Sequence, residues 1–180
     1  EGCHSRAGAW QQATQRYAGP CRIAERARAA GVVRLLYIGT GLGLNLAAAR
    51  AAAGEGELEV VTLERDPEVL AAGLALYERP ELADGPWSAP HRLVRTALCA
   101  ALATPGQPVP LGRGTLELRL GDARATLPEG APFDAIFLAR SFATFNTWSC
   151  GTTWFTSPSR KASCAVYMSP VRIHSVAFAL

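Results

Sequence analysis

The sequence predicts an α/β fold with a doubly wound, mostly parallel sheet, and three observations support this. Short runs of β-branched and apolar residues alternate with Ala-rich stretches of helical composition. The first of these runs ends in a glycine-rich turn. A later run, 133–138, is almost continuously apolar, as expected for a strand buried on both faces. A chain of 180 residues is long enough for one domain with a substantial core.

The remaining elements are assigned from local sequence signals. Residues 10–30 have helical composition, but Gly19-Pro20 interrupts them and Gly31 ends them. Asp66-Pro67-Glu68 combines a capping Asp, a first-turn Pro and an early acid, which predicts a helix start. We further expect strands over 32–38, 58–63 and 115–120, helices over 45–53 and 91–103, a loop over 104–114 and a helical turn over 124–127.

The glycine turn follows the first strand directly, as Gly39-Thr40-Gly41-Leu42-Gly43. Such a turn places backbone N–H groups and a helix N-terminus at the carboxyl edge of the sheet, where a nucleotide-like ligand can approach closely. A dinucleotide GxGxxG motif would need its third glycine at Leu44, so the GxGxG spacing favours a ligand without a pyrophosphate. An ordinary Gly-rich strand-to-helix turn remains the alternative.

Acidic residues follow the second and third predicted strands. Glu64 ends the second strand, where a carboxylate can accept hydrogen bonds from both ribose hydroxyls. Its alternative is a surface Glu beside Arg65. Asp122 follows the third strand in Gly121-Asp122-Ala123, where it can also cap the short helix at Arg124. Features at three successive strand ends are more specific together than any one of them.

These motifs resemble class I S-adenosylmethionine-dependent methyltransferases, which have a Rossmann-like fold. More narrowly, the sequence is similar to the methyltransferase component of the MnmC tRNA-modification proteins, particularly its stand-alone form. The resemblance covers roughly residues 4–138. Its matching segments are His4-Ser5, Gly8-Ala9, Pro20, Arg22-Ile23, Glu25, Ile38 to Asn45, Glu64, Leu120 to Arg124 and Phe133 to Leu138.

The resemblance implies a cofactor, a substrate and a set of site residues. The family transfers a methyl group from S-adenosylmethionine to the aminomethyl arm of a wobble uridine in tRNA. It further implies a cytoplasmic protein without a metal, with a separate oxidase as a partner, and an acid at position 122 that reaches the adenine amine. The cofactor-binding residues it implies are Gly39, Thr40, Gly41, Gly43, Asn45, Glu64, Gly121, Asp122 and Ala123.

Two positions depart from the family pattern. Ala139 stands where the family has a carboxylate after the fourth strand, so no catalytic residue is assigned. Tyr37 stands two residues before the first glycine, where many methyltransferases have an acid. A non-catalytic or defective S-adenosylmethionine-binding domain is therefore a second hypothesis. An NAD(P)-binding oxidoreductase is a third, disfavoured by Gly43 and by the lack of a Tyr-Lys pair before residue 139.

A break in composition falls at the same place as the failed motif. Residues 1–138 hold 14 Arg and 15 acids, a net charge of −1, whereas residues 139–180 hold three Arg, one Lys and no acid. We hypothesise that 1–138 is the cofactor-binding core and that 139–180 is an aberrant tail read in the wrong frame. A divergent natural tail or a fusion would explain the break equally. The family's seven-stranded sheet needs about three more strands, so we expect the sheet to be incomplete at its C-terminal side.

Composition also limits the other classes of function. The net charge of +3 comes entirely from the tail and gives no argument for nucleic-acid binding. Five cysteines without a CxxC pair argue against a disulfide framework or a structural zinc site, and favour a reducing, cytosolic setting. No apolar run reaches the roughly 20 residues of a membrane helix. We expect His91 at the surface or in a capping role rather than in catalysis.

Overall fold

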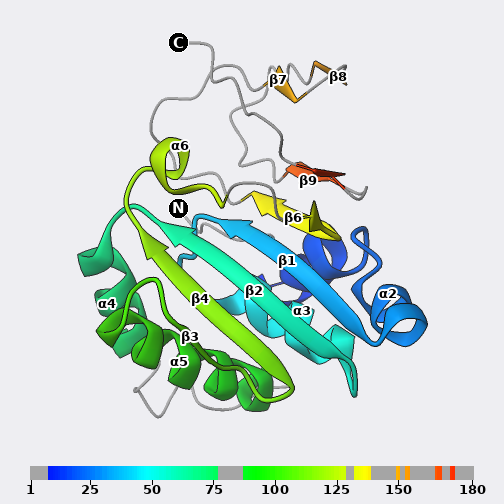
Figure 1. Cartoon of the computed structure of the whole chain (residues 1–180). Coiled ribbons are helices and arrows are strands. Elements are labelled where there is room, and N and C mark those ends of the chain that lie inside the picture. Colours follow the sequence, from blue (N-terminus) through cyan, green and yellow to red (C-terminus); the bar gives the residue numbers. More distant parts are fainter. Residues whose placement is uncertain are drawn as a thin grey trace.

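A six-stranded sheet forms the centre of the computed structural model (Figure 1). The structure describes residues 8–76, 87–128 and 132–138, and short strands within 149–172. Across the sheet the strands are β3 (Pro108–Pro110), β4 (Gly114–Leu120), β2 (Glu57–Glu64), β1 (Val32–Ile38), β6 (Ala135–Leu138) and β9 (Ala165–Tyr167).

The four central strands are parallel, as the alternation of strands and helices predicted. β1 pairs with β2 along its whole length, from Val32 opposite Glu57 to Ile38 opposite Leu63. β4 extends the sheet beyond β2, and β6 extends it on the other side of β1. Numbered as predicted strands, their order is third, second, first, fourth, which is the order of a doubly wound fold. The Rossmann-like α/β fold class is therefore confirmed.

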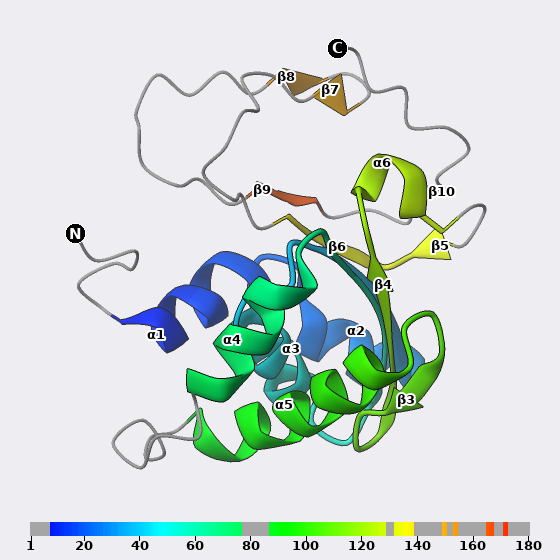
Figure 2. The ribbon, with the colours of Figure 1, turned by 90° about the vertical axis from the view of Figure 1, so that its left-hand side faces the viewer.

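Five of the α-helices lie on one face of this sheet, and Figure 2 shows them as a single layer. They pack there because their apolar residues meet the inward residues of the strands, such as Leu35, Leu58 and Leu116. A π-helical segment, η1, continues the first of them. The helices are α1 (Ala9–Ala13), η1 (Thr14–Ala18), α2 (Ile23–Ala30), α3 (Leu44–Ala53), α4 (Pro67–Leu76) and α5 (Ser88–Ala103), with α6 (Ala123–Thr126) beyond the carboxyl edge of β4.

The opposite face of the sheet carries a smaller apolar cluster. Leu36, Leu63 and Phe133 are buried there, and Val61 and Leu127 pack against them. Their positions follow from strand alternation: Leu36 lies between Leu35 and Tyr37, which both point to the helical layer. No helix as long as α3 or α5 covers this face in the part of the chain that the structure describes.

Two local predictions are corrected. The expected loop over 104–114 contains β3, which pairs antiparallel with β4 from Pro108 opposite Glu117 to Pro110 opposite Thr115. Its prolines are tolerated because β3 is an edge strand. The single strand expected over 133–138 is divided into β5 (Pro132–Phe133) and β6. Asp134 divides it, since its carboxylate accepts a hydrogen bond from Arg34 N at 2.8 Å while its own N–H donates to Arg34 O.

Short strands of the C-terminal segment extend the sheet edge. β9 pairs antiparallel with β6, from Ile136 opposite Tyr167 to Leu138 opposite Ala165. Within the described residues the sheet has six strands, fewer than the seven that the resemblance implies, so it is incomplete as expected. β10 (Val171–Arg172) pairs with β5, and β7 (Ser149–Cys150) pairs with β8 (Thr153–Trp154). Among the described helices, none has the length and apolar character to cross a membrane.

Candidate ligand site at the glycine turn

The glycine turn connects β1 to α3 at the carboxyl edge of the sheet. Gly39, Gly41 and Gly43 all have positive φ, at 82°, 52° and 76°. L-residues with a side chain rarely adopt such values, which explains why the chain has glycine at each position. Gly43 is the N-cap of α3, so the first N–H groups of a ten-residue helix lie at this edge.

The first half of the turn is anchored to β2. Gly39 N donates to Leu63 O at 2.9 Å, which extends the β1–β2 pairing by one residue. Thr40 is fully buried and its Oγ1 lies 2.7 Å from Thr62 Oγ1, with Leu63 O at 3.3 Å. Two buried hydroxyls that satisfy each other cost no unpaired polar group and fix the entry into the turn. Thr40 is thus part of the support of the turn.

Glu64 reaches back from the end of β2 to the turn. Its Oε2 accepts a hydrogen bond from Gly41 N at 3.1 Å, and its Oε1 accepts from Arg65 N at 2.8 Å and Asp66 N at 3.3 Å. The contact with Gly41 brings together two features that the sequence predicted at strand ends, the glycine turn after β1 and the acid at the end of β2. A carboxylate has about four acceptor positions, and these three hydrogen bonds leave Glu64 about one for a hydroxyl donor of a ligand.

Gly41 and Gly43 have different structural reasons to be glycine. A Cβ on Gly43 would lie 2.9 Å from Leu98 Cδ1 and 3.2 Å from Val94 Cγ1, so α5 packs directly against it. A Cβ on Gly41 would meet only the Gly39 carbonyl oxygen, at 4.0 Å. The GxGxG spacing, which favoured a ligand without a pyrophosphate, therefore includes Gly43, whose positive φ and contact with α5 explain the glycine without any ligand. Gly41 is the glycine whose exposed side is open to a ligand.

Asn45 and Tyr37 form a pair below the turn. Asn45 Nδ2 donates to Tyr37 Oη at 2.8 Å, from the first turn of α3 to the end of β1. Tyr37 is 2% exposed, and its ring lies edge-on to Phe137 with centroids 5.9 Å apart. Where many methyltransferases have an acid before the glycines, this chain has a buried phenol whose hydroxyl is bound by an amide.

The end of β4, the third predicted strand, is joined to Glu64 by a backbone hydrogen bond. Gly121 N donates to Glu64 O at 2.9 Å. Asp122 caps α6 by accepting from Arg124 N at 2.9 Å, and the Arg124 guanidinium also contacts its carboxylate, with Nε–Oδ1 at 3.0 Å. The hydrogen bonds from Arg124 hold the pKa of Asp122 well below its usual range. The capping role expected of Asp122 is confirmed, and Ala123 begins the helix that it caps.

Several predicted or missed residues complete the description. His91 is 2% exposed, so its expected surface position is wrong, and its Nε2 lies 2.9 Å from Leu42 O in the glycine turn. A lone histidine in a helix gives no sequence signal of such a contact. Ala139, His4 and Ser5 lie outside the described residues. Within the described part of the chain, no cluster of three or more His, Cys, Asp or Glu could hold a metal.

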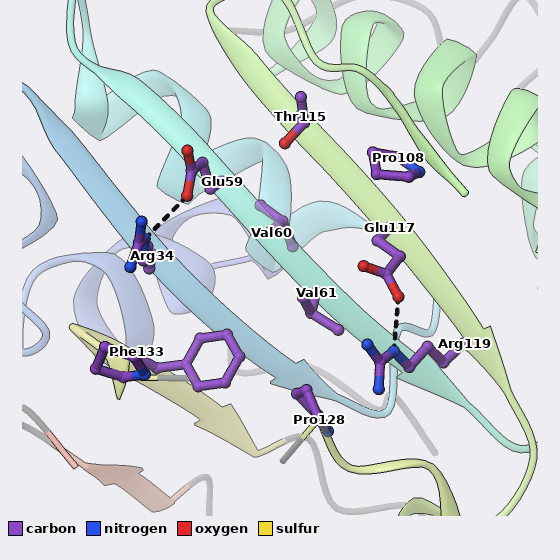
Figure 3. A pocket seen from close by; sticks show the side chains of 11 residues that line it. Arg34, Glu59, Val60, Val61, Pro108, Thr115, Glu117, Arg119, Pro128 and Phe133 are labelled. Carbon is purple, nitrogen blue, oxygen red and sulfur yellow. Dashed lines mark hydrogen bonds and ion pairs between the residues drawn. The ribbon is translucent and has the colours of Figure 1, made fainter. Parts of the chain in front are cut away.

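A separate hollow of about 290 Å³ lies on the face of the sheet opposite the helical layer (Figure 3). Two ion pairs line it: Arg34 Nε to Glu59 Oε2 at 3.0 Å, and Arg119 Nε to Glu117 Oε1 at 2.7 Å. These four charges neutralise one another within the hollow. None of the predicted site residues lines it. The glycine turn is therefore the better candidate, because there a carboxylate from the end of β2 meets the backbone of the turn, next to the N-terminus of α3.

Comparison with known proteins supports the fold. No protein-family model and no curated protein matches the sequence. Among solved structures, the chain is similar to MNMC2 from Aquifex aeolicus, with 26% sequence identity and a TM-score of 0.53. The chain has an MnmC-like fold. The similarity covers 74% of this chain and 41% of that protein, so the chain spans about two fifths of its length.

Proposed function

We propose that this chain binds S-adenosylmethionine through its glycine turn, as the cofactor-binding part of an MnmC-like methyltransferase. The observation that carries the proposal is the hydrogen bond from Gly41 N to Glu64 Oε2, at 3.1 Å. It brings the glycine turn and the carboxylate at the end of β2 into one site, which is the arrangement that nucleoside ligands need. The similarity to MNMC2 supports the same cofactor class.

The residues of the turn fit such a ligand in three ways. The left-handed turn at Gly41 has no side chain to block close approach. Glu64 keeps about one acceptor position for a ribose hydroxyl beside its three backbone hydrogen bonds. The N-terminus of α3 offers N–H groups and a positive dipole end to a carboxylate such as that of the cofactor's methionine part. In this proposal Gly39, Thr40, Gly43 and Asn45 shape the turn, while Gly121, Asp122 and Ala123 border it at the end of β4.

The substrate in this proposal is the aminomethyl group of a wobble uridine in tRNA, as the resemblance implies. When bound, the cofactor supplies the methyl group. The protein's task is then to place a neutral amine in line with it. Ala139 has no carboxylate to orient that amine or to take its proton. This position favours a second candidate function, in which the chain binds the cofactor without transferring its methyl group.

Calorimetry separates the ligand classes. The full chain is titrated with S-adenosylmethionine, S-adenosylhomocysteine and NAD, and we expect saturable binding of both adenosyl ligands and none of NAD. Binding of NAD alone would point to the oxidoreductase alternative. The absence of heat with either adenosyl ligand would overturn both S-adenosylmethionine hypotheses.

A methyl-transfer assay separates the first candidate from the second. Radiolabelled S-adenosylmethionine is supplied with tRNA that carries aminomethyl uridine, and incorporation into the tRNA is counted. The Ala139→Asp variant is assayed beside the natural chain. Activity in the natural chain supports the first candidate. Cofactor binding without transfer, with activity gained in Ala139→Asp, supports the second and also speaks for an otherwise intact pocket.

We also propose that residues 1–138 are the functional core and that 139–180 are read out of frame. The segment 148–151 can be encoded by TGG AGC TGT GGG, which in another frame reads Glu-Leu-Trp, the end of a family motif. The strands described beyond residue 139 have only two or three residues each, compared with seven or eight in β1 and β2. Sequencing the DNA across 135–180 tests the proposal: codons that cannot yield those residues in another frame would exclude it.

A further inference from the structure

The second half of the glycine turn is held from the helical layer. Leu42 packs against α4 at Gly73, where a Cβ would lie 2.5 Å from Leu42 Cδ2. Gly43 packs against Val94 and Leu98 of α5. The first half of the turn is fixed by β2, whereas the second half depends on contacts from two helices far along the chain.

His91 makes the polar contact in this group. It lies in the first turns of α5, is 2% exposed, and places its Nε2 2.9 Å from Leu42 O, across 49 residues of sequence. A carbonyl oxygen can only accept, so Nε2 carries the proton and donates it. The rings of Trp87 and His91 contact each other edge to face, with centroids 5.6 Å apart, which further limits rotation of the imidazole.

This hydrogen bond determines the orientation of one peptide group. The Leu42 carbonyl and the Gly43 N–H belong to the same planar unit, so fixing one fixes the other. In the observed orientation Gly43 N donates to Thr40 O at 3.2 Å. In the next peptide unit Gly43 O accepts from Ala47 N at 2.9 Å as α3 begins. Glycine permits many backbone conformations, so Gly43 restricts this peptide little by itself. The Gly43–Thr40 hydrogen bond restrains it from within the turn, and the His91 contact restrains it from α5.

We infer that His91 is a positioning residue for the ligand site: by donating to the Leu42 carbonyl it holds the Leu42–Gly43 peptide, and with it the N-terminus of α3, in the orientation that receives the ligand. The inference rests on the proposed function for the identity of the ligand. The effect of His91 on the turn does not depend on the proposed function, because the hydrogen bond exists in the ligand-free protein.

Three variants test the role of His91. His91→Leu removes the donor and keeps much of the volume, whereas His91→Gln retains an N–H donor at a similar reach. Leu102→Ala serves as the control, because Leu102 packs against the same core near the far end of α5 and away from the turn. Affinity for S-adenosylhomocysteine is measured by calorimetry and stability by thermal unfolding.

We expect His91→Leu to weaken binding about tenfold, in keeping with the loss of one buried hydrogen bond. His91→Gln should stay within about threefold of the natural chain. Leu102→Ala should lower the melting temperature without changing the affinity. Natural affinity in His91→Leu, or a His91→Gln variant as weak as His91→Leu, would overturn the inference.

A second readout keeps this test distinct from that of the proposed function. Amide hydrogen exchange of Gly43 and Ala47, whose N–H groups donate to Thr40 O and Gly43 O, is followed by NMR in the protein without ligand. In His91→Leu we expect these two amides to exchange about tenfold faster, with His91→Gln close to the natural chain. If the natural chain binds no adenosyl ligand, the proposed function fails while this measurement still decides the role of His91: unchanged exchange in His91→Leu would exclude it.

Discussion

The Glu64 carboxylate accepts a hydrogen bond from Gly41 N at 3.1 Å and thereby connects the end of β2 to the turn that follows β1. The two residues are 23 positions apart in the chain, and parallel pairing of β1 with β2 brings them together. The same carboxylate accepts from two more backbone N–H groups, of Arg65 and Asp66. Glu64 therefore arrives at the candidate site already oriented.

Replacement of Glu64 by Gln should weaken ligand binding more than stability. The amide keeps the shape of the side chain but loses the negative charge and one of the two acceptor oxygens. A ribose hydroxyl would therefore donate to a weaker acceptor. We expect the affinity for S-adenosylhomocysteine to fall about tenfold, which is roughly 1.4 kcal/mol. Calorimetry provides the measurement.

Glu55→Gln is the matched control for this variant. Glu55 is exposed and pairs with Arg113 away from the turn, so its replacement should leave the affinity unchanged. Equal losses in the two variants would show that net charge, rather than the position of Glu64, controls binding.

Alanine at Gly41 should reduce binding more than stability, whereas alanine at Gly43 should reduce stability more than binding. Gly41→Ala places a methyl group on the open side of the turn, where the ligand would approach, so binding should suffer most. The left-handed backbone at this position also costs about 1–2 kcal/mol of stability. Gly43→Ala adds overlap with Leu98 and Val94 and should cost about 3 kcal/mol of stability. Urea unfolding and calorimetry on both variants measure the balance. A Gly41→Ala variant that binds as tightly as the natural chain would contradict a ligand at this turn.

Arg50 should contribute to stability from the opposite edge of the sheet. It is 6% exposed, and its guanidinium donates to the carbonyls of Arg113 at 2.6 Å, Gly56 at 2.9 Å and Gly54. Arg50→Met leaves these acceptors without their donor, and we expect the free energy of unfolding to fall by about 3 kcal/mol. Urea unfolding measures it, with Arg28→Met as the control because Arg28 is exposed. A change in Arg50→Met no larger than in the control would refute the role.

The stability of the protein should fall as the solution becomes mildly acidic. Burial lowers the pKa of His91 below its usual value of 6.5, against the opposing effect of the Leu42 carbonyl and together with the nearby Arg95. Between the lowered pKa and about pH 6.5, the unfolded chain takes up a proton that the folded chain does not, so lower pH favours unfolding. The slope has an upper limit of about 1.4 kcal/mol per pH unit. Urea unfolding at several values between about pH 5.5 and 7.5 should show the decline.

His91→Gln provides the comparison for the pH experiment. Glutamine does not titrate, so the part of the decline that comes from position 91 should be absent in the variant. The natural chain should therefore lose stability more steeply than the variant as the pH falls below about 6.5, and the two curves should run parallel above about pH 7.5. Curves that are parallel at every pH would show that His91 takes up its proton equally in the folded and unfolded states.

The parallel core could be predicted from sequence because its signals are local. The apolar run before Gly39, the Asp66-Pro67 helix start and the Leu alternation at 115–120 each depend on neighbouring residues only. β3 was missed because two prolines in three residues argue against a strand, and its edge position, which permits them, is a property of the assembled sheet. The split at Asp134 was missed for a similar reason, since Arg34 is 100 residues away.

The sequence alone determined the α/β class, the glycine turn and the presence of an acid after each of two strands, because strand period, backbone freedom and capping are read along the chain. Tertiary structure decided which of these residues meet. Parallel pairing of β1 with β2 brought Glu64 within hydrogen-bond distance of Gly41. Packing of α5 leaves no room for a side chain at Gly43, and the buried His91 hydrogen-bonds to the Leu42 carbonyl. Such contacts join residues that are distant in sequence, so no local pattern records them and only the packed chain shows them.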